Sequence, residues 1–179
     1  RRMWLQVVFR DSQMAPIFQH GAYDEESAIL EGINTKVYEA HLGVDAALAA
    51  LVGKKPGPSF HFTLVNTVLM DNRIPPRGFP NAAFALAQAS PVGIKYADGQ
   101  FWDDTRFHIP AGATSAVVRL WYQTASREYI EFLRDLNRTN SAGSDMYLFW
   151  ELNDRSPPVL MGEAMSGDPV ATEEYDILA

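Results

Sequence analysis

The 179-residue sequence contains no cysteine. Without a thiol, the chain cannot form a disulfide, a thiolate nucleophile or an iron–sulfur cluster, and it cannot attach haem covalently. It also lacks any apolar run approaching the roughly 18 to 20 residues that a membrane-spanning helix needs. These absences exclude several kinds of chemistry, but they do not assign a reaction.

Basic residues are in short supply. Lysine and arginine number 15 against 22 aspartates and glutamates, so the formal net charge is −7. Non-specific nucleic-acid binding depends on neutralising phosphates with basic side chains, and this charge balance argues against that function. The 47% apolar and 12% aromatic content indicates a packed globule. We expect one domain over residues 1–165, followed by an acidic tail over residues 166–179.

Catalytic motifs are also missing. The sequence contains no Gly-x-Ser-x-Gly elbow, no phosphate-cradling loop and no dinucleotide fingerprint. Catalytic activity within this chain therefore has little support. The sequence begins inside an expected strand and without methionine. This start suggests a fragment of a longer polypeptide, and an N-terminus left by signal-peptide cleavage is the alternative.

Alternating apolar residues predict several short strands separated by turns rich in proline and glycine. The expected strands cover residues 1–10, 15–20, 35–41, 59–65, 113–122 and 157–162. Helices are expected over 46–52, capped by Asp45, over 82–88, capped by Asn81, and from Ser126 onward. Periodicity leaves 145–152 open between helix and strand. This pattern predicts a mainly β fold, an antiparallel β-sandwich with short helices inserted in the connections.

The stretch from Gly57 to Asp104 combines charge, amides and a stiff backbone. Prolines at positions 75, 76 and 80 fix φ and constrain the residues before them. We expect Arg73 and Arg77 to be held by carboxylates, the candidates being Asp71, Asp98, Asp103 and Asp104. Such pairs would make the loop a structural latch, built on Asp71, Arg73 and Arg77, between the expected strand at 59–65 and the segment 96–104.

The same stretch offers oxygen ligands. Asp98, Gln100, Asp103 and Asp104 could supply the hard donors that calcium prefers, although their spacing is not that of an EF-hand loop. In the alternative interpretation, which we favour, the carboxylates satisfy turn amides and pair with the arginines.

Four histidines are present, at positions 20, 41, 61 and 108, and no two have the i, i+4 spacing of a helical metal site. A structural role is favoured for each. His61 is the best functional candidate, because it lies between two phenylalanines beside the proline-rich loop and could face a partner or the edge of a cofactor. Copper binding by His61, His20 and His41 is the alternative hypothesis. A carbohydrate-binding function, the other form of this alternative, would require a row of exposed aromatic residues such as Trp102.

Several segments together resemble one family. They are Arg1–Leu5, Gly57–Phe62, Asp71–Phe79, Tyr96–Asp104 and the stretch from Tyr122 to Asp135. Over most of residues 1–162 the chain resembles the haem-free, β-rich C-terminal region of certain bacterial multihaem c-type cytochromes. Asp71–Phe79 is the most distinctive of these matches, and the family's Cys-x-x-Cys-His motif is absent.

The resemblance implies an accessory or assembly domain of an electron-transfer protein that is periplasmic or extracellular. Haem c would then belong to an associated or upstream part, which the domain shields or docks, and a homo-oligomer is left open. The family supplies no catalytic residue that can be carried over. The alternative is a secreted β-sandwich that binds copper, calcium or carbohydrate.

Overall fold

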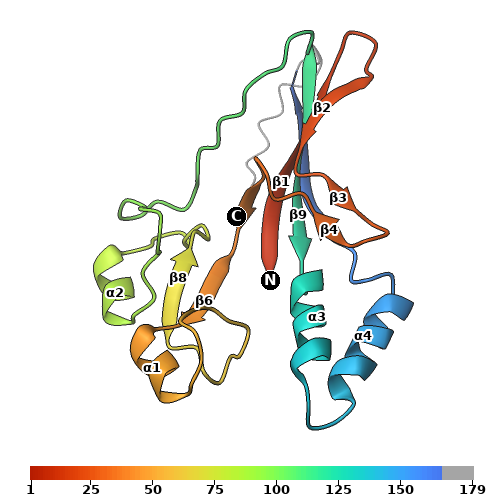
Figure 1. Cartoon of the computed structure of the whole chain (residues 1–179). Helices are drawn as coiled ribbons and strands as arrows, with labels where there is room; N and C mark the ends of the chain where they lie inside the picture. Colours follow the sequence, from red (N-terminus) through yellow and green to blue (C-terminus); the bar gives the residue numbers. More distant parts are fainter. Residues whose placement is uncertain (167–179) are drawn as a thin grey trace. The chain divides into compact units, whose positions relative to one another are not determined.

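The computed structural model describes residues 1–166 (Figure 1). The predicted mainly β character, with antiparallel sheets and short helices in the connections, is confirmed. The chain divides into two compact units. Among the described residues, the first unit comprises 1–37 and 105–166, and the second is Tyr38–Asp104. A single domain over 1–165 stays a prediction, and the predicted acidic tail lies outside the described residues from position 167.

The first unit is built on an antiparallel sheet. Its strand order is β10 (Val159–Ser166), β9 (Ser115–Gln123), β1 (Arg2–Arg10), β2 (Pro16–His20), and β5 (Lys36–Tyr38) also pairs with β1. β1 and β9 pair along their whole length, from Arg2 opposite Gln123 to Arg10 opposite Ser115. Their alternation buries Val7, Phe9 and Ala116 in one cluster.

Trp4 is the largest fully buried side chain of this unit, with none of its surface exposed. Its indole nitrogen donates to the carbonyl of Gly21 at 3.3 Å, and its ring lies 5.7 Å from that of Tyr23. Gly21 has φ +68°, and a Cβ there would lie 2.4 Å from the Leu5 carbonyl oxygen. Only glycine allows the chain to turn this close to β1.

The remaining elements of the first unit form a second cluster. They are β3 (Tyr23–Asp24), β4 (Ile29–Leu30), α3 (Arg127–Leu136) and α4 (Ala142–Leu152). The helix expected from Ser126 onward is α3, with Ser126 as its N-cap, and residues 145–152 lie in a helix. Ala28, Ile130 and Trp150 form the buried centre. A Cβ at Gly143 would lie 2.1 Å from the Leu133 carbonyl oxygen, so glycine permits the close approach of α3 and α4.

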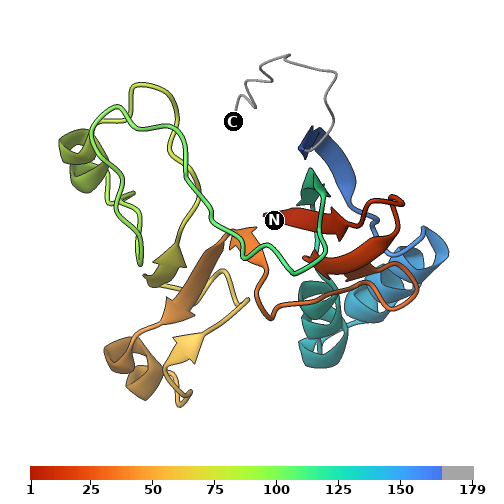
Figure 2. The same cartoon turned by 90° about the horizontal axis from the view of Figure 1, so that it is seen from above.

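The second unit holds a smaller antiparallel sheet in the order β7 (Gly57–Pro58), β6 (Ala40–Val44), β8 (Thr67–Asp71). It also contains α1 (Ala46–Leu51) and α2 (Asn81–Leu86). Asp45 caps α1 as predicted, accepting from the Leu48 backbone at 2.8 Å. Between α2 and β9 the chain forms no further helix, and the next helix, α3, follows β9 (Figure 2).

The expected strand at 59–65 is wrong. This segment forms turns, with the backbone amides of Leu64 and Val65 both donating to the His61 carbonyl. Phe60 and Phe62 are 41% and 59% exposed, so their alternation does not mark a buried strand face. The cap of α2 also differs, because Pro80 is the N-cap residue and Asn81 begins the helix. The last strand runs over Val159–Ser166 rather than 157–162.

Candidate functional site

Residues 72–104, which we call the central loop, leave β8 and stay ordered with little regular structure. Asp71 and Val92 exchange two backbone hydrogen bonds, of 2.8 and 2.9 Å, in an isolated antiparallel bridge. This bridge ties the middle of the loop back to the end of β8. The loop is therefore closed at its base by backbone contacts, in addition to the prolines that stiffen it.

Phe79 is a buried anchor within the central loop. Its side chain is 1% exposed and packs edge-on against Phe84, with ring centroids 4.5 Å apart. The Phe79 carbonyl accepts from the Gly99 amide at 2.6 Å, which joins the two halves of the loop. The two rings also line a depression of about 240 Å³, whose other walls include Ile74 and the prolines 75, 76 and 91.

Asp98, in the second half of the central loop, accepts hydrogen bonds at the N-terminus of α2. One carboxylate oxygen accepts from both the backbone and the side-chain amide of Asn81, each at 2.8 Å. The Asn81 amide also donates to the Tyr96 carbonyl at 3.0 Å. The backbone hydrogen bond from Asn81, followed by that from its side chain, lowers the pKa of Asp98. Its stabilising contribution is therefore present at neutral pH and is lost as pH falls through the lowered pKa.

Tyr96 is the buried centre of the loop, with 5% of its surface exposed. Its hydroxyl donates to the Asn72 carbonyl at 3.0 Å, while the Asn72 side chain accepts from the Glu39 amide at 2.8 Å. Burial, with the nearby Asp103 charge, raises the pKa of Tyr96 to about 12. The hydroxyl therefore stays protonated at neutral pH and acts as a structural donor.

Arg73 and Asp71 form the ion pair that the sequence predicted. The Arg73 Nε donates to one carboxylate oxygen at 2.8 Å and Nη2 donates to the other, which is bidentate geometry. Burial raises the pKa of Asp71, but the Arg73 hydrogen bonds and charge outweigh it and hold the pKa below its ordinary value. The Arg73 side chain is 63% exposed, whereas Asp71 is 16% exposed. Solvent therefore screens this pair from one side.

Arg73→Ala is expected to cost no more than about 1 kcal/mol of unfolding free energy, because exposed ion pairs contribute little. A loss of 3 to 5 kcal/mol would require a buried pair, which the exposure of Arg73 does not provide. Thermal and urea unfolding of the variant beside the parent protein would measure the difference. A drop of several kcal/mol would show that the pair, rather than the hydrogen bonds of Asp98 and Tyr96, holds the loop.

The end of the loop presents aromatic rings. The Arg77 guanidinium lies 4.6 Å from the centroid of the Phe101 ring, and Trp102 meets Phe101 edge-on at 5.3 Å. Gln100 shapes this segment, accepting from the Ala97 amide at 3.0 Å and donating to the Trp102 carbonyl at 2.9 Å. Trp102 is 51% exposed. Its ring and that of Phe101 stand nearly perpendicular, at 89°, so the two do not form a flat platform.

The residues proposed for calcium have other contacts. Asp98 accepts from Asn81, Gln100 bonds within its own turn, and Asp103 accepts from the Tyr38 hydroxyl at 3.2 Å. Among residues 1–166, no group of three acidic, histidine or cysteine side chains is arranged to hold a metal ion. Calcium binding by these residues together with Asp104 stays a prediction, as does the latch role of Asp71, Arg73 and Arg77.

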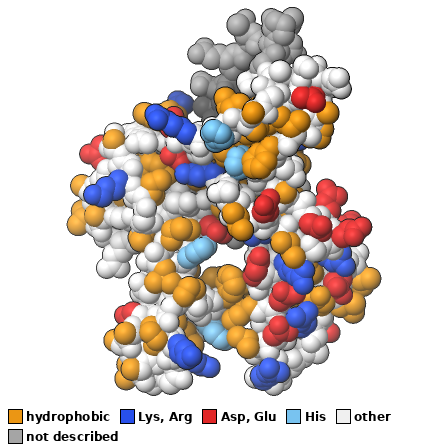
Figure 3. Space-filling model, turned by 45° about the horizontal axis from the view of Figure 1, so that its top comes forward, with side chains coloured by type: hydrophobic (Ala, Val, Ile, Leu, Met, Phe, Trp, Pro, Cys, Tyr) orange, Lys and Arg blue, Asp and Glu red, His pale blue; other side chains and the backbone are white. Residues whose placement is uncertain are grey.

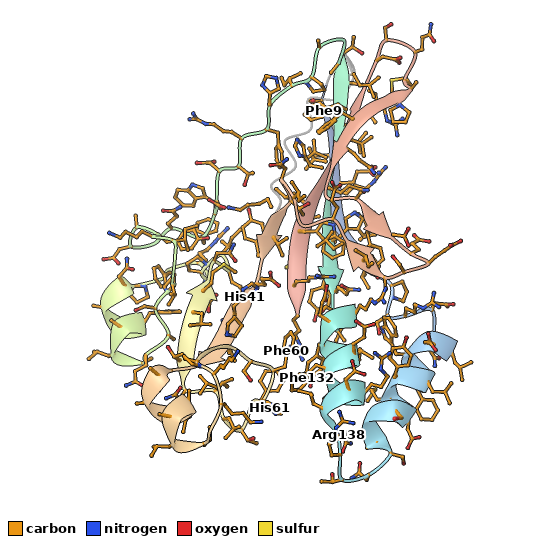
Figure 4. All side chains as sticks on the ribbon, viewed as in Figure 1. Phe9, His41, Phe60, His61, Phe132 and Arg138 are labelled. Atoms are coloured by element: carbon orange, nitrogen blue, oxygen red, sulfur yellow. The ribbon has the colours of Figure 1, made fainter. Side chains whose placement is uncertain are left out.

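The three histidines of the copper hypothesis lie in different surroundings. His20 belongs to the first unit and contacts the rings of Phe9, Phe18 and Phe107. His41 lies on β6 and its Nε2 is 2.8 Å from a carboxylate oxygen of Glu39. Figure 4 shows His61 beside Phe60 on the segment that follows β7. The role of His61 at a cofactor edge stays a prediction.

Comparison with known proteins adds one distant match. No family model and no curated protein matches this sequence. Among solved structures, a penta-heme cytochrome c552 from Thermochromatium tepidum matches with a TM-score of 0.40 and 13% sequence identity. The match covers 92% of this chain and 29% of that chain. A match at this level assigns no function. In the described residues, no helix is long and apolar enough to cross a bilayer.

Proposed function

We propose that this chain is a haem-free accessory region of a multihaem c-type cytochrome outside the cytoplasm, and that the central loop docks the haem-bearing part. The observation that carries the proposal is an exposed tryptophan on a braced loop. Trp102 is 51% exposed, while Phe79 and Tyr96, which anchor the same loop, are 1% and 5% exposed. Partly exposed aromatic residues on a preorganised support are typical centres of protein interfaces.

The resemblance of Asp71–Phe79 and Tyr96–Asp104 to cytochrome sequences supports this choice of partner, because both segments belong to the central loop, apart from Asp71 at the end of β8. The chain has no cysteine to attach haem c, so the haem would lie in the associated or upstream part. The side chains of this chain would then orient and cover that part without handling electrons themselves. His61 would contribute an imidazole at the haem edge.

Intact-mass analysis and a haem stain of the native material would test the partner. We expect the chain to be found joined to, or co-purified with, a polypeptide that carries covalent haem. A stand-alone polypeptide of 20.0 kDa with no cytochrome bound would refute the proposal.

Trp102→Ala is expected to weaken docking without unfolding the chain. An exposed ring contributes little to folding, whereas a central interface tryptophan typically contributes about 2 kcal/mol or more, at least a 30-fold loss in affinity. Binding to the purified haem-bearing part can be followed by calorimetry, with melting temperatures as the folding check. Leu86→Ala, at an 88% exposed position of α2, is the matched control. Unchanged affinity of the Trp102 variant would place docking elsewhere.

A further inference from the structure

α4 is apolar on two opposite sides. Trp150 is 5% exposed and Gly143 lies against α3, so these residues mark the buried side. On the other side, Leu148, Phe149 and Leu152 are 53%, 62% and 70% exposed. Their i, i+1, i+4 spacing gathers them on one stripe of the helix, which we call the α4 outer face. A stripe of three large apolar residues exposed together is typical of an interaction surface.

Carboxylates surround this face. Asp145 lies in the first turn of α4, and its side chain accepts from Ser141 at 2.9 Å. Glu151, on the flank of the stripe, also lines a cavity of about 510 Å³. The other charged side chains of that cavity are Glu25, Glu26, Asp154 and Arg155. Red carboxylates, blue basic side chains and orange apolar side chains are interspersed over the part of the first unit that holds α3 and α4 (Figure 3).

Arg155 offsets only part of the negative charge of this cavity. Its Nη1 donates to the backbone carbonyl of Glu26, and its Nη2 lies 3.9 Å from the Glu151 carboxylate. Five carboxylates therefore border the α4 outer face and the cavity beside it, against one guanidinium. An excess of negative charge next to an apolar stripe selects a partner that is apolar and positively charged.

Three other binding partners, namely a second copy of the chain, its own C-terminal residues and an anionic membrane, fit this acidic surface poorly. A second copy would bring the same acidic face against itself, and like charges across an interface are repulsive. Residues 167–179 of this chain carry four carboxylates and neither lysine nor arginine. A membrane surface rich in anionic lipid would meet the same repulsion.

We propose that the α4 outer face and the adjoining acidic cavity bind a cationic amphipathic segment of another protein. Its apolar side would cover Leu148, Phe149 and Leu152, and its lysine or arginine side chains would enter the cavity bordered by Glu151 and Asp154. This is the helix-on-face mode of peptide recognition, in which apolar anchors supply affinity and charges fix the orientation. This surface lies on the first unit, and the proposal does not depend on the role of the central loop.

A labelled lysine–leucine peptide of about 18 residues, patterned as an amphipathic helix, serves as the probe. Its binding to the full chain is followed by fluorescence anisotropy at low and at physiological salt. Leu152→Ser is expected to weaken binding roughly ten-fold by removing an apolar anchor without changing charge. The double variant Glu151→Gln/Asp154→Asn is expected to weaken it at low salt and to reduce the salt dependence.

Two controls make the test specific. Leu86→Ser changes an 88% exposed leucine on α2 and is expected to bind the probe as the parent does. A peptide with glutamate in place of lysine is expected not to bind. Circular dichroism and melting temperatures verify that each variant is folded. If Leu152→Ser binds like the parent, the attraction is non-specific charge, and if the double variant binds like the parent, the cationic partner is wrong; either result overturns the proposal.

Discussion

Phe79→Ala should destabilise the second unit by about 3 to 5 kcal/mol, the range for deleting a buried phenylalanine ring. Phe79 is 1% exposed, and its ring packs edge-on against Phe84 beside the depression that both rings line with prolines of the central loop. Loss of the ring would leave a cavity beneath a loop whose prolines resist collapse into it. The cost is therefore expected near the upper end of the range.

Differential scanning calorimetry would measure this change. Leu86→Ala, in the same unit and 88% exposed, should shift stability by no more than about 0.5 kcal/mol. If Phe79→Ala moves one of two transitions, the two units unfold separately. If it moves a single transition for the whole chain, residues 1–165 behave as one cooperative domain. A Phe79→Ala protein as stable as its parent would contradict the packing described for the loop.

Trp4→Ala should cost the first unit a similar amount, about 3 to 5 kcal/mol. The indole is fully buried, contacts Tyr23 and donates to the Gly21 carbonyl. Truncation removes the ring and also leaves that buried carbonyl without its donor, which adds an unsatisfied polar group to the cavity.

Trp4→Phe tests these two contributions, because it keeps a buried six-membered aromatic ring and removes the remainder of the indole together with its N–H. We expect its loss of stability to be clearly smaller than that of Trp4→Ala, and urea unfolding of both variants beside the parent would show it. Equal losses would mean that the hydrogen bond to Gly21, and not the packing, dominates at this position.

Local sequence signals predicted part of the fold well. The alternation in residues 113–122 corresponds to β9, and the N-terminal alternation corresponds to β1. Asp45 and Ser126 cap the helices that follow them. Each of these signals depends on neighbouring residues alone, through strand pleat or N-cap geometry.

Signals that depend on distant partners were misleading. The alternation at 59–65 predicted a strand, but His61 organises a local turn there. Asn81 looks like an N-cap from its neighbours, yet the acceptor that satisfies its amides is Asp98, seventeen positions away. A strand needs a partner strand to pair with, and the first backbone amides of a helix need an acceptor. Neither partner can be assigned from residues adjacent in sequence.

The candidate site shows the same division. The density of proline and charge predicted that the central loop is ordered, and it predicted the contact between Arg73 and Asp71. It did not predict that Tyr96 and Asn81 connect the two halves of the loop, because neutral hydrogen-bonding side chains leave no charge pattern. The only signal for Tyr96 was an aromatic residue next to Ala97-Asp98-Gly99, a turn-forming sequence.

The interrupted first unit has a consequence for the order of folding. β1 pairs with β9 from Arg10 opposite Ser115 onward, so the central strands meet only after closing a loop of roughly one hundred residues. The chain of the second unit lies entirely within that loop. During synthesis on a ribosome, Tyr38–Asp104 emerges completely before β9, the partner strand of β1, has been made. Early collapse of that segment would shorten the effective loop and reduce the entropic barrier to forming the longest strand pair in the molecule.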